Sequence, residues 1–593
     1  MLICGPTIPV FLRPNHLRIS EPVPHRMKAR LIKGTKFMRP IIAFAILLFP
    51  LAAVAGLPEP SMTSIQPELL AMPGSLSNAW GDFDRDGDLD LAVSLKSGEV
   101  RLYRNDEGTL VSIGGPLGLP TAGGEFRGLS WGDYDSDGWL DLMAGSTLPD
   151  KPSAVFHNDS GKRFVNVAEA LGLTVPGRSS RQNNWIDYDN DGDVDIYTTD
   201  RTGANKLFRN DGGRFTQVFA AGAPTVTSST VGACWLDFDK DGDLDLFLGN
   251  QSGKADQLLR NDGDKGFSDV APQLGMTSLP RTKDEGGVGC AVGDYDRDGE
   301  LDIFVPNYGH NALWHNNGDG SFTNTAKETD VGIENHAVGT AWGDYDNDGY
   351  PDLVVMSYVG DSPVSRPKDS LFHNEGGKRF INVLDEGSPL NAGDHGVSWV
   401  DYNNDGAIDL SVTRGYTEHG SHFVFRNNLP ADKARQSLSV MVLDAKGRYT
   451  QAGAEVRVYG AKGQLLGAGQ VSTGGGYNSQ NAAPVHFGLP GQTRVTVEVT
   501  FMGNTGRKVH RSPMSRPSAI SAGLWWSVAL SASDGHSRSI GDLILEVFFD
   551  LPACVPQGPE LLVRQELQLV ATVRRARLGR RAVAHGTNGL DRG

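Results

Sequence analysis

The chain has 593 residues, of which 71 are Asp or Glu, 55 are Lys or Arg and 74 are Gly, and its formal net charge is −16. This length exceeds that of one ordinary domain, and the acidic balance argues against a basic nucleic-acid-binding protein, so we expect no nucleic-acid partner. With 39% hydrophobic and 21% charged residues, the composition is typical of a folded protein and excludes a disordered one.

The N-terminal segment is basic and leads into a short apolar run. Residues 41–55 (IIAFAILLFPLAAVA) end in Ala-Val-Ala. A run of about 15 residues is shorter than the roughly 20 that cross a bilayer, and small-x-small is typical of a cleavage site. We therefore predict a signal peptide over 1–55, with residues before Met27 or Met38 due to a mis-assigned start. The mature chain is expected to be secreted or periplasmic, with no stable membrane anchor.

One motif dominates the region that follows. WGDFDRDGDLDL (Trp80–Leu91) recurs in variants that begin at Trp131, Trp185, Trp235, Val292, Trp342 and Trp399. Each repeat divides into four short strands, and turn residues separate the third strand from the fourth. This period and strand number predict an all-β fold with a seven-bladed β-propeller over 56–428.

The last repeat lacks a fourth strand of its own. Its third strand ends at Asn427, and the segment beginning at Met62 matches the missing strand in spacing. We predict that this N-terminal strand completes the last blade and thereby pairs its open edge.

Two cysteines, Cys234 and Cys290, lie in equivalent strands of successive repeats. A disulfide between them is one alternative. Because they occupy different positions along those strands, buried free thiols are the preferred interpretation.

The shared loop has the pattern D-x-D-x-D-G-x-x-D. Carboxylates at positions 1, 3 and 5 converge when the chain turns at the Gly of position 6, position 7 offers its backbone carbonyl, and position 9 supplies a closing carboxylate. Such oxygen ligands, without His or Cys, favour Ca²⁺ over Zn²⁺ or Cu²⁺. An EF-hand is excluded because position 12 is never Glu. We expect up to seven structural Ca²⁺ ions and no catalytic role for them.

The expected ligand positions, loop by loop, are Asp82, Asp84, Asp86, Asp88 and Asp90; Asp133, Asp135, Asp137, Trp139 and Asp141; Asp187, Asp189, Asp191, Asp193 and Asp195; Asp237, Asp239, Asp241, Asp243 and Asp245; Asp294, Asp296, Asp298, Glu300 and Asp302; Asp344, Asp346, Asp348, Tyr350 and Asp352; and Asp401, Asn403, Asp405, Ala407 and Asp409.

These loops and the strands after them resemble the FG-GAP (VCBS-type) repeat of integrin-alpha propellers, over about residues 62–428. Farther on, QAGAEVRVYGAKG (451–463), GGGYNSQNAAPVHFGLP (474–490) and VTVEVTFMGNTG resemble the ASPIC/UnbV domain of cartilage acidic protein-like proteins. The resemblance implies a secreted calcium-binding protein, and it assigns a role only to the loop aspartates. We place a linker at 429–436, a small β-rich domain at 437–508, and an unassigned tail at 509–593.

Two functions remain open from the sequence. The first is a binding or adhesion module for an extracellular protein or glycan, which would use the varied loops on the face opposite the acidic loops. The alternative is a secreted carbohydrate-active enzyme, a lyase or hydrolase, with a site over the propeller channel. There His336 and His395 would reach the channel, and Arg127 and Arg181 would neutralise an acidic sugar. No established catalytic motif occurs, so the sequence favours the binding module, leaves the enzyme open as the alternative, and assigns no catalytic residue.

Overall fold

The computed structural model describes residues 57, 59–148, 151–174, 180–218, 222–276, 281–358, 369–391, 395–414, 421–515 and 525–529. The chain divides into two compact units, Met1–Ala55 and Gly56–Gly593, and the following description concerns the second. The predicted signal peptide and most of the predicted tail lie outside the described residues. No described helix has the length and apolar character needed to cross a membrane.

Each repeat forms one sheet whose four strands are neighbours in antiparallel order. The first sheet contains β2 (Ser75–Gly81), β3 (Asp90–Leu95), β4 (Val100–Asp106) and β5 (Thr109–Ser112). The second contains β6 (Phe126–Gly132), β7 (Asp141–Ser146), β8 (Ala154–Asn158) and β9 (Phe164–Asn166). The third contains β10 (Ser180–Ile186), β11 (Asp195–Asp200), β12 (Lys206–Asn210) and β13 (Phe215–Gln217).

The remaining repeats follow the same plan. The fourth sheet contains β14 (Thr230–Leu236), β15 (Asp245–Asn250), β16 (Gln257–Asn261) and β17 (Phe267–Asp269), with the 3₁₀ turn η1 (Gly263–Lys265). The fifth contains β19 (Ala291–Gly293), β20 (Asp302–Val305), β22 (Ala312–Asn316) and β23 (Phe322–Asn324), beside the short pair β18 (Gly286–Gly287) and β21 (Asn307–Tyr308). The sixth contains β24 (Ala337–Gly343), β25 (Asp352–Ser357), β26 (Ser370–Asn374) and β27 (Phe380–Asn382).

The last sheet joins the two ends of the repeat region. It contains β28 (Gly396–Val400), β29 (Asp409–Thr413), β30 (His422–Asn427) and the N-terminal strand β1 (Met62–Ser64), which precedes the short helix α1 (Pro67–Leu70). Strand β1 pairs antiparallel with β30, and Met62 lies opposite Asn427. The predicted use of the N-terminal strand is therefore confirmed.

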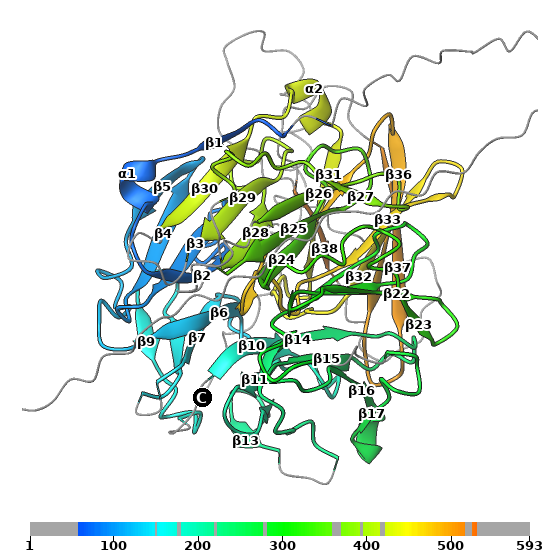
Figure 1. Cartoon of the computed structure of the whole chain (residues 1–593). Coiled ribbons are helices and arrows are strands. Elements are labelled where there is room, and N and C mark those ends of the chain that lie inside the picture. The colour runs from blue at the N-terminus through cyan, green and yellow to red at the C-terminus, as the bar shows by residue number, and fades with distance from the viewer. Residues whose placement is uncertain are drawn as a thin grey trace, which may run out of the picture. The chain divides into compact units, whose positions relative to one another are not determined.

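The sheets follow one another around a common centre (Figure 1). The first strand of each sheet contacts the first strand of the next, from β2 through β6, β10, β14, β19 and β24 to β28, and β28 contacts β2. The penultimate residues of the first strands in the first four repeats are Trp80, Trp131, Trp185 and Trp235, each at most 1% exposed. Burying such large apolar rings between neighbouring sheets is a main source of stability.

The preferred interpretation of the cysteines was wrong, because Cys234 and Cys290 form a disulfide. Their Cα atoms lie 6.2 Å apart, although 56 residues separate them in the sequence. The one-residue offset along the strands does not prevent bonding because Gly232 and Gly289, which lack side chains, let the two backbones approach closely here.

The C-terminal module contains two small sheets and follows helix α2 (Ala431–Ala434). One has the order β33 (Leu465–Gln470), β32 (Glu455–Gly460), β36 (Arg494–Phe501) and β37 (Lys508–Ser515). In the other, β31 (Ser437–Leu443) lies between β35 (Val485–Gly488) and β38 (Trp525–Ala529). The unassigned tail was expected to begin at residue 509, but β37 and β38 extend the β structure beyond that point. Strand β37 pairs with β36, and β38 pairs with β31.

A loop of the C-terminal module enters the centre of the repeat region. Residues 473–482 contain the short strand β34 (Ser479–Gln480), which pairs in parallel with β6. Gly476 exchanges backbone hydrogen bonds with Thr340 of β24. Its φ is +58°, and a Cβ atom there would lie 2.3 Å from the carbonyl oxygen of Val397. The glycine run in GGGYNSQ is therefore explained by a chain that passes between closely spaced first strands.

Candidate functional site

The seven acidic loops share one backbone conformation. In the first loop, position 4 (Arg85) has φ +61° and position 6 (Gly87) has φ +99°. The same two positions have positive φ in the other six loops. This repeated geometry turns the chain tightly enough to bring positions 1, 3 and 5 together.

The aspartate at position 1 organises each loop from within. In the second loop, Asp133 Oδ1 accepts a hydrogen bond from the backbone N–H of Asp137 at 3.0 Å, and Oδ2 accepts one from Gly138 at 2.9 Å. Asp133 is 1% exposed. Its backbone partners hold the carboxylate in place before any ion binds.

Carboxylate oxygens of positions 1, 3 and 5 lie close together in the first and second loops. Asp82, Asp84 and Asp86 each offer an oxygen within 4.8 Å of the others. Burial, together with the charge of Asp86, raises the pKa of Asp82 to about 7. A bound cation would offset both the burial of the carboxylates and the repulsion between them. Hard oxygen donors suit Ca²⁺. The residues present therefore fit the expected ion.

Position 9 ties the loop to two strands. Asp90 accepts hydrogen bonds from the backbone N–H groups of Phe83 at 3.0 Å and Asn105 at 2.8 Å. The Asn105 side chain in turn donates to the carbonyl oxygens of Leu89 and, in the seventh loop, Tyr402. This asparagine near the end of the third strand thus joins neighbouring sheets, a role that its sequence position alone did not show.

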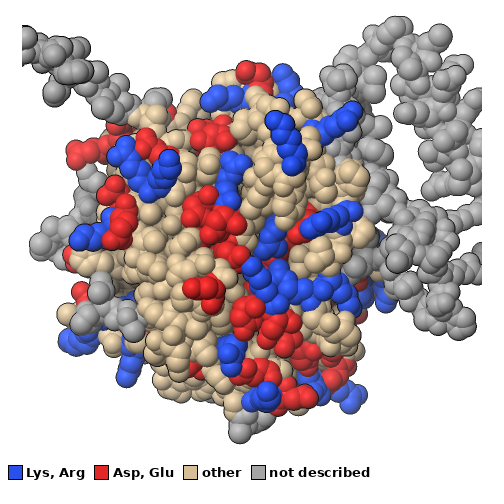
Figure 2. All heavy atoms as spheres, turned by 90° about the vertical axis from the view of Figure 1, so that its right-hand side faces the viewer, with Lys and Arg blue, Asp and Glu red and all other residues tan. Residues whose placement is uncertain are grey.

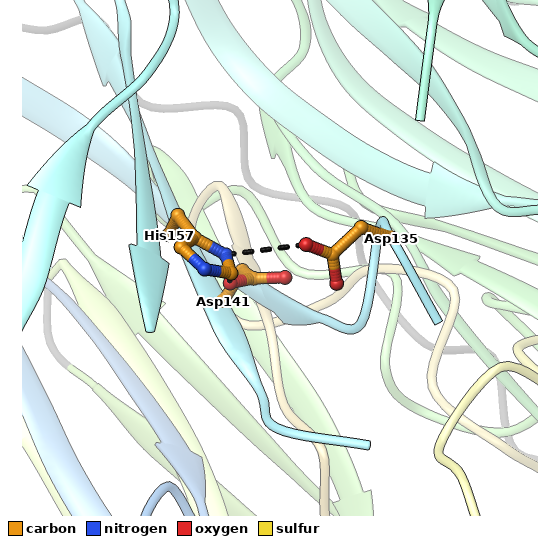
Figure 3. Close-up of side chains that lie close together, drawn as sticks. All are labelled: Asp135, Asp141 and His157. Atoms are coloured by element: carbon orange, nitrogen blue, oxygen red, sulfur yellow. Dashed lines mark ion pairs between the residues drawn. The ribbon is translucent and has the colours of Figure 1, made fainter. Parts of the chain in front are cut away.

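Three histidines beside the loops were missed by the sequence analysis. His157 Nδ1 lies 3.3 Å from Asp135 Oδ2 and 3.2 Å from Asp141 Oδ1 (Figure 3). His315 and His373 occupy the same place in the fifth and sixth repeats. The signal was present in the third strands, where these repeats have His-Asn and the other four have Arg-Asn.

These histidines change the charge around the carboxylates of three loops. A hydrogen bond to Asp141 raises the pKa of His157 to about 9. A protonated imidazole supplies positive charge next to the carboxylates, whereas a neutral one is itself a metal donor. The second, fifth and sixth loops therefore carry a histidine next to their carboxylates that the expected ligand positions did not include.

The side chain at position 7 contacts the preceding loop. Asn190, at position 4 of the third loop, donates to Asp243 Oδ1 at 2.8 Å, and Asn404 of the seventh loop donates to Asp88 Oδ1 of the first at 3.1 Å. The Arg297 guanidinium lies 4.5 Å from the ring centre of Tyr350. Position 7 was expected to act only through its carbonyl, but its side chain also links successive loops.

The C-terminal module covers several of the loops. Arg457 donates to the carbonyl oxygen of Gly299 at 3.0 Å, and Arg448 donates to that of Ser136 at 3.0 Å. Arg507 Nη1 lies 3.4 Å from Asp237 Oδ2. On the face drawn in Figure 2, acidic clusters alternate with Lys and Arg side chains. The module therefore brings cations to the loop face and shields some of its carboxylates.

The residues of the alternative channel site also come together. Arg127, Arg181 and His395 line one cavity at the starts of the first strands, away from the acidic loops. His336 lies near it, and its ring centre is 3.8 Å from that of Tyr308. Burial lowers the pKa of His395 to about 3, so this side chain is neutral at physiological pH. The varied loops on this side, which we expected to bind a ligand, include 358–368 and 416–422, and most of these two segments lies outside the described residues.

Comparison with known sequences finds two families. The family described as FG-GAP-like repeat matches residues 82–144, 187–248, 237–305 and 294–355. The family described as ASPIC and UnbV matches residues 446–522. No curated protein matches this chain.

Solved structures show weaker likeness. The mercury-soaked crystal structure of BBS1N in complex with ARL6DN has a TM-score of 0.41 and 10% identity, and covers 63% of this chain and 99% of that one. An Agrocybe aegerita lectin that recognises non-reducing terminal N-acetylglucosamine has a TM-score of 0.34 and 18% identity, and covers 60% of this chain and 90% of that one. We draw no conclusion about function from either likeness.

Proposed function

This chain is an FG-GAP repeat protein with a C-terminal ASPIC and UnbV domain, and on that premise we propose that it is a secreted, calcium-stabilised binding module. Its repeats would form a closed, seven-bladed propeller, supported by the pairing of β1 with β30 and the contact of β28 with β2. Its ligand would be an extracellular protein or glycan.

The calcium part of the proposal rests on the repeated carboxylate geometry. The aspartates at positions 1, 3 and 5 would hold one ion per loop, and position 1 is already oriented by backbone N–H groups. Binding to the folded state alone stabilises by RT ln(1 + [L]/Kd), about 1.4 kcal/mol per loop at about 1 mM Ca²⁺ for a Kd of roughly 0.1 mM. Several loops together would supply a large share of a typical net stability.

Calorimetric titration of chelator-treated protein tests calcium binding directly. We expect several sites and a melting temperature that rises with Ca²⁺. Asp239→Ala should remove one site, whereas Asp264→Ala, which deletes an exposed carboxylate outside the loops, should remove none. A melting curve indifferent to chelator would contradict the proposal.

The binding part requires a separate test. The mature chain is probed on arrays of glycans and extracellular proteins, with and without Ca²⁺. Saturable binding without chemical change of the ligand supports a binding module. Turnover of a carbohydrate would replace it with the alternative, a lyase or hydrolase.

A further inference from the structure

A cavity lies at the mouth of the central channel, on the side opposite the acidic loops. Its volume is about 270 Å³, and its walls include Arg127, Arg181, Arg201, Tyr308, Tyr358 and Tyr477. Arg127 and Arg181 lie at the starts of β6 and β10, while Arg201 directly follows β11. The antiparallel strand order brings these ends of the strands to the same face. Three cations from two sheets therefore converge on one space.

The positive charge of this cavity is not balanced by its own walls. No acidic side chain lines it among the described residues. Arg127 donates through Nε to Glu125 at 3.0 Å. Neither Arg181 nor Arg201 forms an ion pair with any carboxylate of the described chain, and Arg181, which is 5% exposed, has the backbone oxygen of Ser180 as its hydrogen-bond acceptor. Burial and the charge of Arg127 lower the pKa of Arg181 to about 10.

Burying an arginine that forms no ion pair is costly, and an anionic ligand would offset that cost. The charges of Tyr477 and Glu125 oppose the lowering of the Arg181 pKa only in part. A guanidinium also offers paired N–H donors that match the oxygens of a carboxylate, sulfate or phosphate. The positive charge and the donor geometry of these arginines therefore favour a small anion as the ligand.

The other walls supply neutral groups for hydroxyls. Gln251 is 5% exposed, and its Oε1 has no hydrogen-bond partner within the described part of the chain. His395 also lines the cavity and is neutral at physiological pH. Tyrosine rings present flat apolar faces next to these polar groups. An acceptor, a neutral imidazole and aromatic faces suit a ligand that carries hydroxyls as well as an acid.

One wall comes from the C-terminal module. Tyr477 belongs to the loop that passes through the centre, and its hydroxyl accepts a hydrogen bond from Arg127 Nη1 at 3.3 Å. Burial alone would raise the pKa of Tyr477, but Arg127 and Arg181 lower it overall. The cavity is thus completed only when the module's loop is inserted between the first strands.

We propose that this cavity binds a sugar acid or a similar hydroxylated organic acid, with its acidic group on Arg181 and Arg201. The biological role of this cavity rests on the proposed binding function, whose ligand would then be such an acid. It does not depend on the calcium loops.

Calorimetry with the calcium-loaded mature chain tests the proposal, using glucuronate, galacturonate, glucose, inorganic sulfate and inorganic phosphate. We expect at least one uronate to bind and glucose not to bind. Arg201→Gln, at an exposed position, should weaken uronate binding by about tenfold or more, equivalent to about 1.4 kcal/mol. Arg163→Gln, which changes an exposed arginine directly before β9 of the second sheet, should leave uronate binding unchanged.

Three results would overturn the proposal. The first is no uronate binding at about 10 mM, since a Kd of that size corresponds to a binding free energy of only about −2.7 kcal/mol. The others are uronate binding that Arg201→Gln does not weaken, and binding of sulfate or phosphate with no uronate binding. Arg181→Gln gives a second test, at a buried position. Provided that its melting temperature is unchanged, this variant should also weaken uronate binding, and unweakened binding would overturn the proposal. If uronates fail to bind while an array ligand binds, the cavity assignment fails and the proposed binding function stands.

Discussion

The side chain of Gln480 pairs with the backbone of Trp185 as a neighbouring strand would. Its Oε1 accepts from the Trp185 N–H at 2.8 Å, and its Nε2 donates to the Trp185 carbonyl oxygen at 2.9 Å. Thr473 makes the corresponding pair with Trp235. The inserted loop therefore satisfies backbone groups that first strands leave open at the centre.

Gln480→Ala should lower the free energy of unfolding, because it leaves two buried backbone groups without partners. Each such group costs about 1–3 kcal/mol. Urea denaturation measures the loss. Gln464→Ala, at an exposed position of the same module, is the control and should change little. Equal stability of the two variants would show that the inserted loop does not bind the first strands in solution.

The disulfide between Cys234 and Cys290 should stabilise the repeat region. It closes a loop of 56 residues, for which the loss of chain entropy in the unfolded state gives about 4 kcal/mol in the simple model and typically 2–4 in practice. The double variant Cys234→Ala/Cys290→Ala should therefore unfold at lower urea concentration. Mass spectrometry of non-reduced peptides provides the direct check, and free thiols in exported protein would contradict the pairing.

The seventh loop should bind calcium more weakly than the others. Position 3 is the neutral Asn403, whose Nδ2 donates to Asp405 Oδ2 at 3.0 Å. Asn403→Asp adds one carboxylate and should tighten the weakest site in a calorimetric titration by about tenfold, or about 1.4 kcal/mol. Gln273→Glu adds the same charge at an exposed turn and should not. No change in the weakest site would argue against an ion at this loop.

A buried histidine should make the protein less stable in acid. Burial lowers the pKa of His422 to about 3, below the value of about 6.5 in an unfolded chain. The unfolded state therefore binds the extra proton first, so this stability is present above about pH 6.5 and falls by about 1.4 kcal/mol per unit as pH drops toward 4. His422→Gln should flatten the pH dependence measured in saturating Ca²⁺. His310→Gln, at an exposed position, should not alter the slope.

Removal of the N-terminal strand should expose a sheet edge. Deleting residues 61–70 removes β1, which pairs with β30, and the buried Leu70. The uncovered edge of β30 should then promote association, visible by size-exclusion chromatography. A chain that begins at residue 61 keeps β1 and serves as the control. A monomeric, equally stable deletion variant would contradict the role of β1.

The sequence by itself determined the repeated elements of this protein. Strand order and the shape of the acidic loops depend on residues close together in the chain, such as Asp82 and Gly87, so a local pattern suffices to predict them. The use of Met62 to complete the last sheet was also predictable, because one strand was missing from an otherwise regular count.

Only the tertiary structure decided which distant side chains meet. The Cys234–Cys290 bond, the pairing of Gln480 with Trp185 and the contact of Tyr477 with Arg127 join separate sheets or modules, and the approach of His157 to Asp135 joins two different segments of one sheet. Their partners depend on how neighbouring sheets pack around the centre and on which side chains the inserted loop presents there. No period in the sequence encodes those distances, because packing sets them across the whole fold.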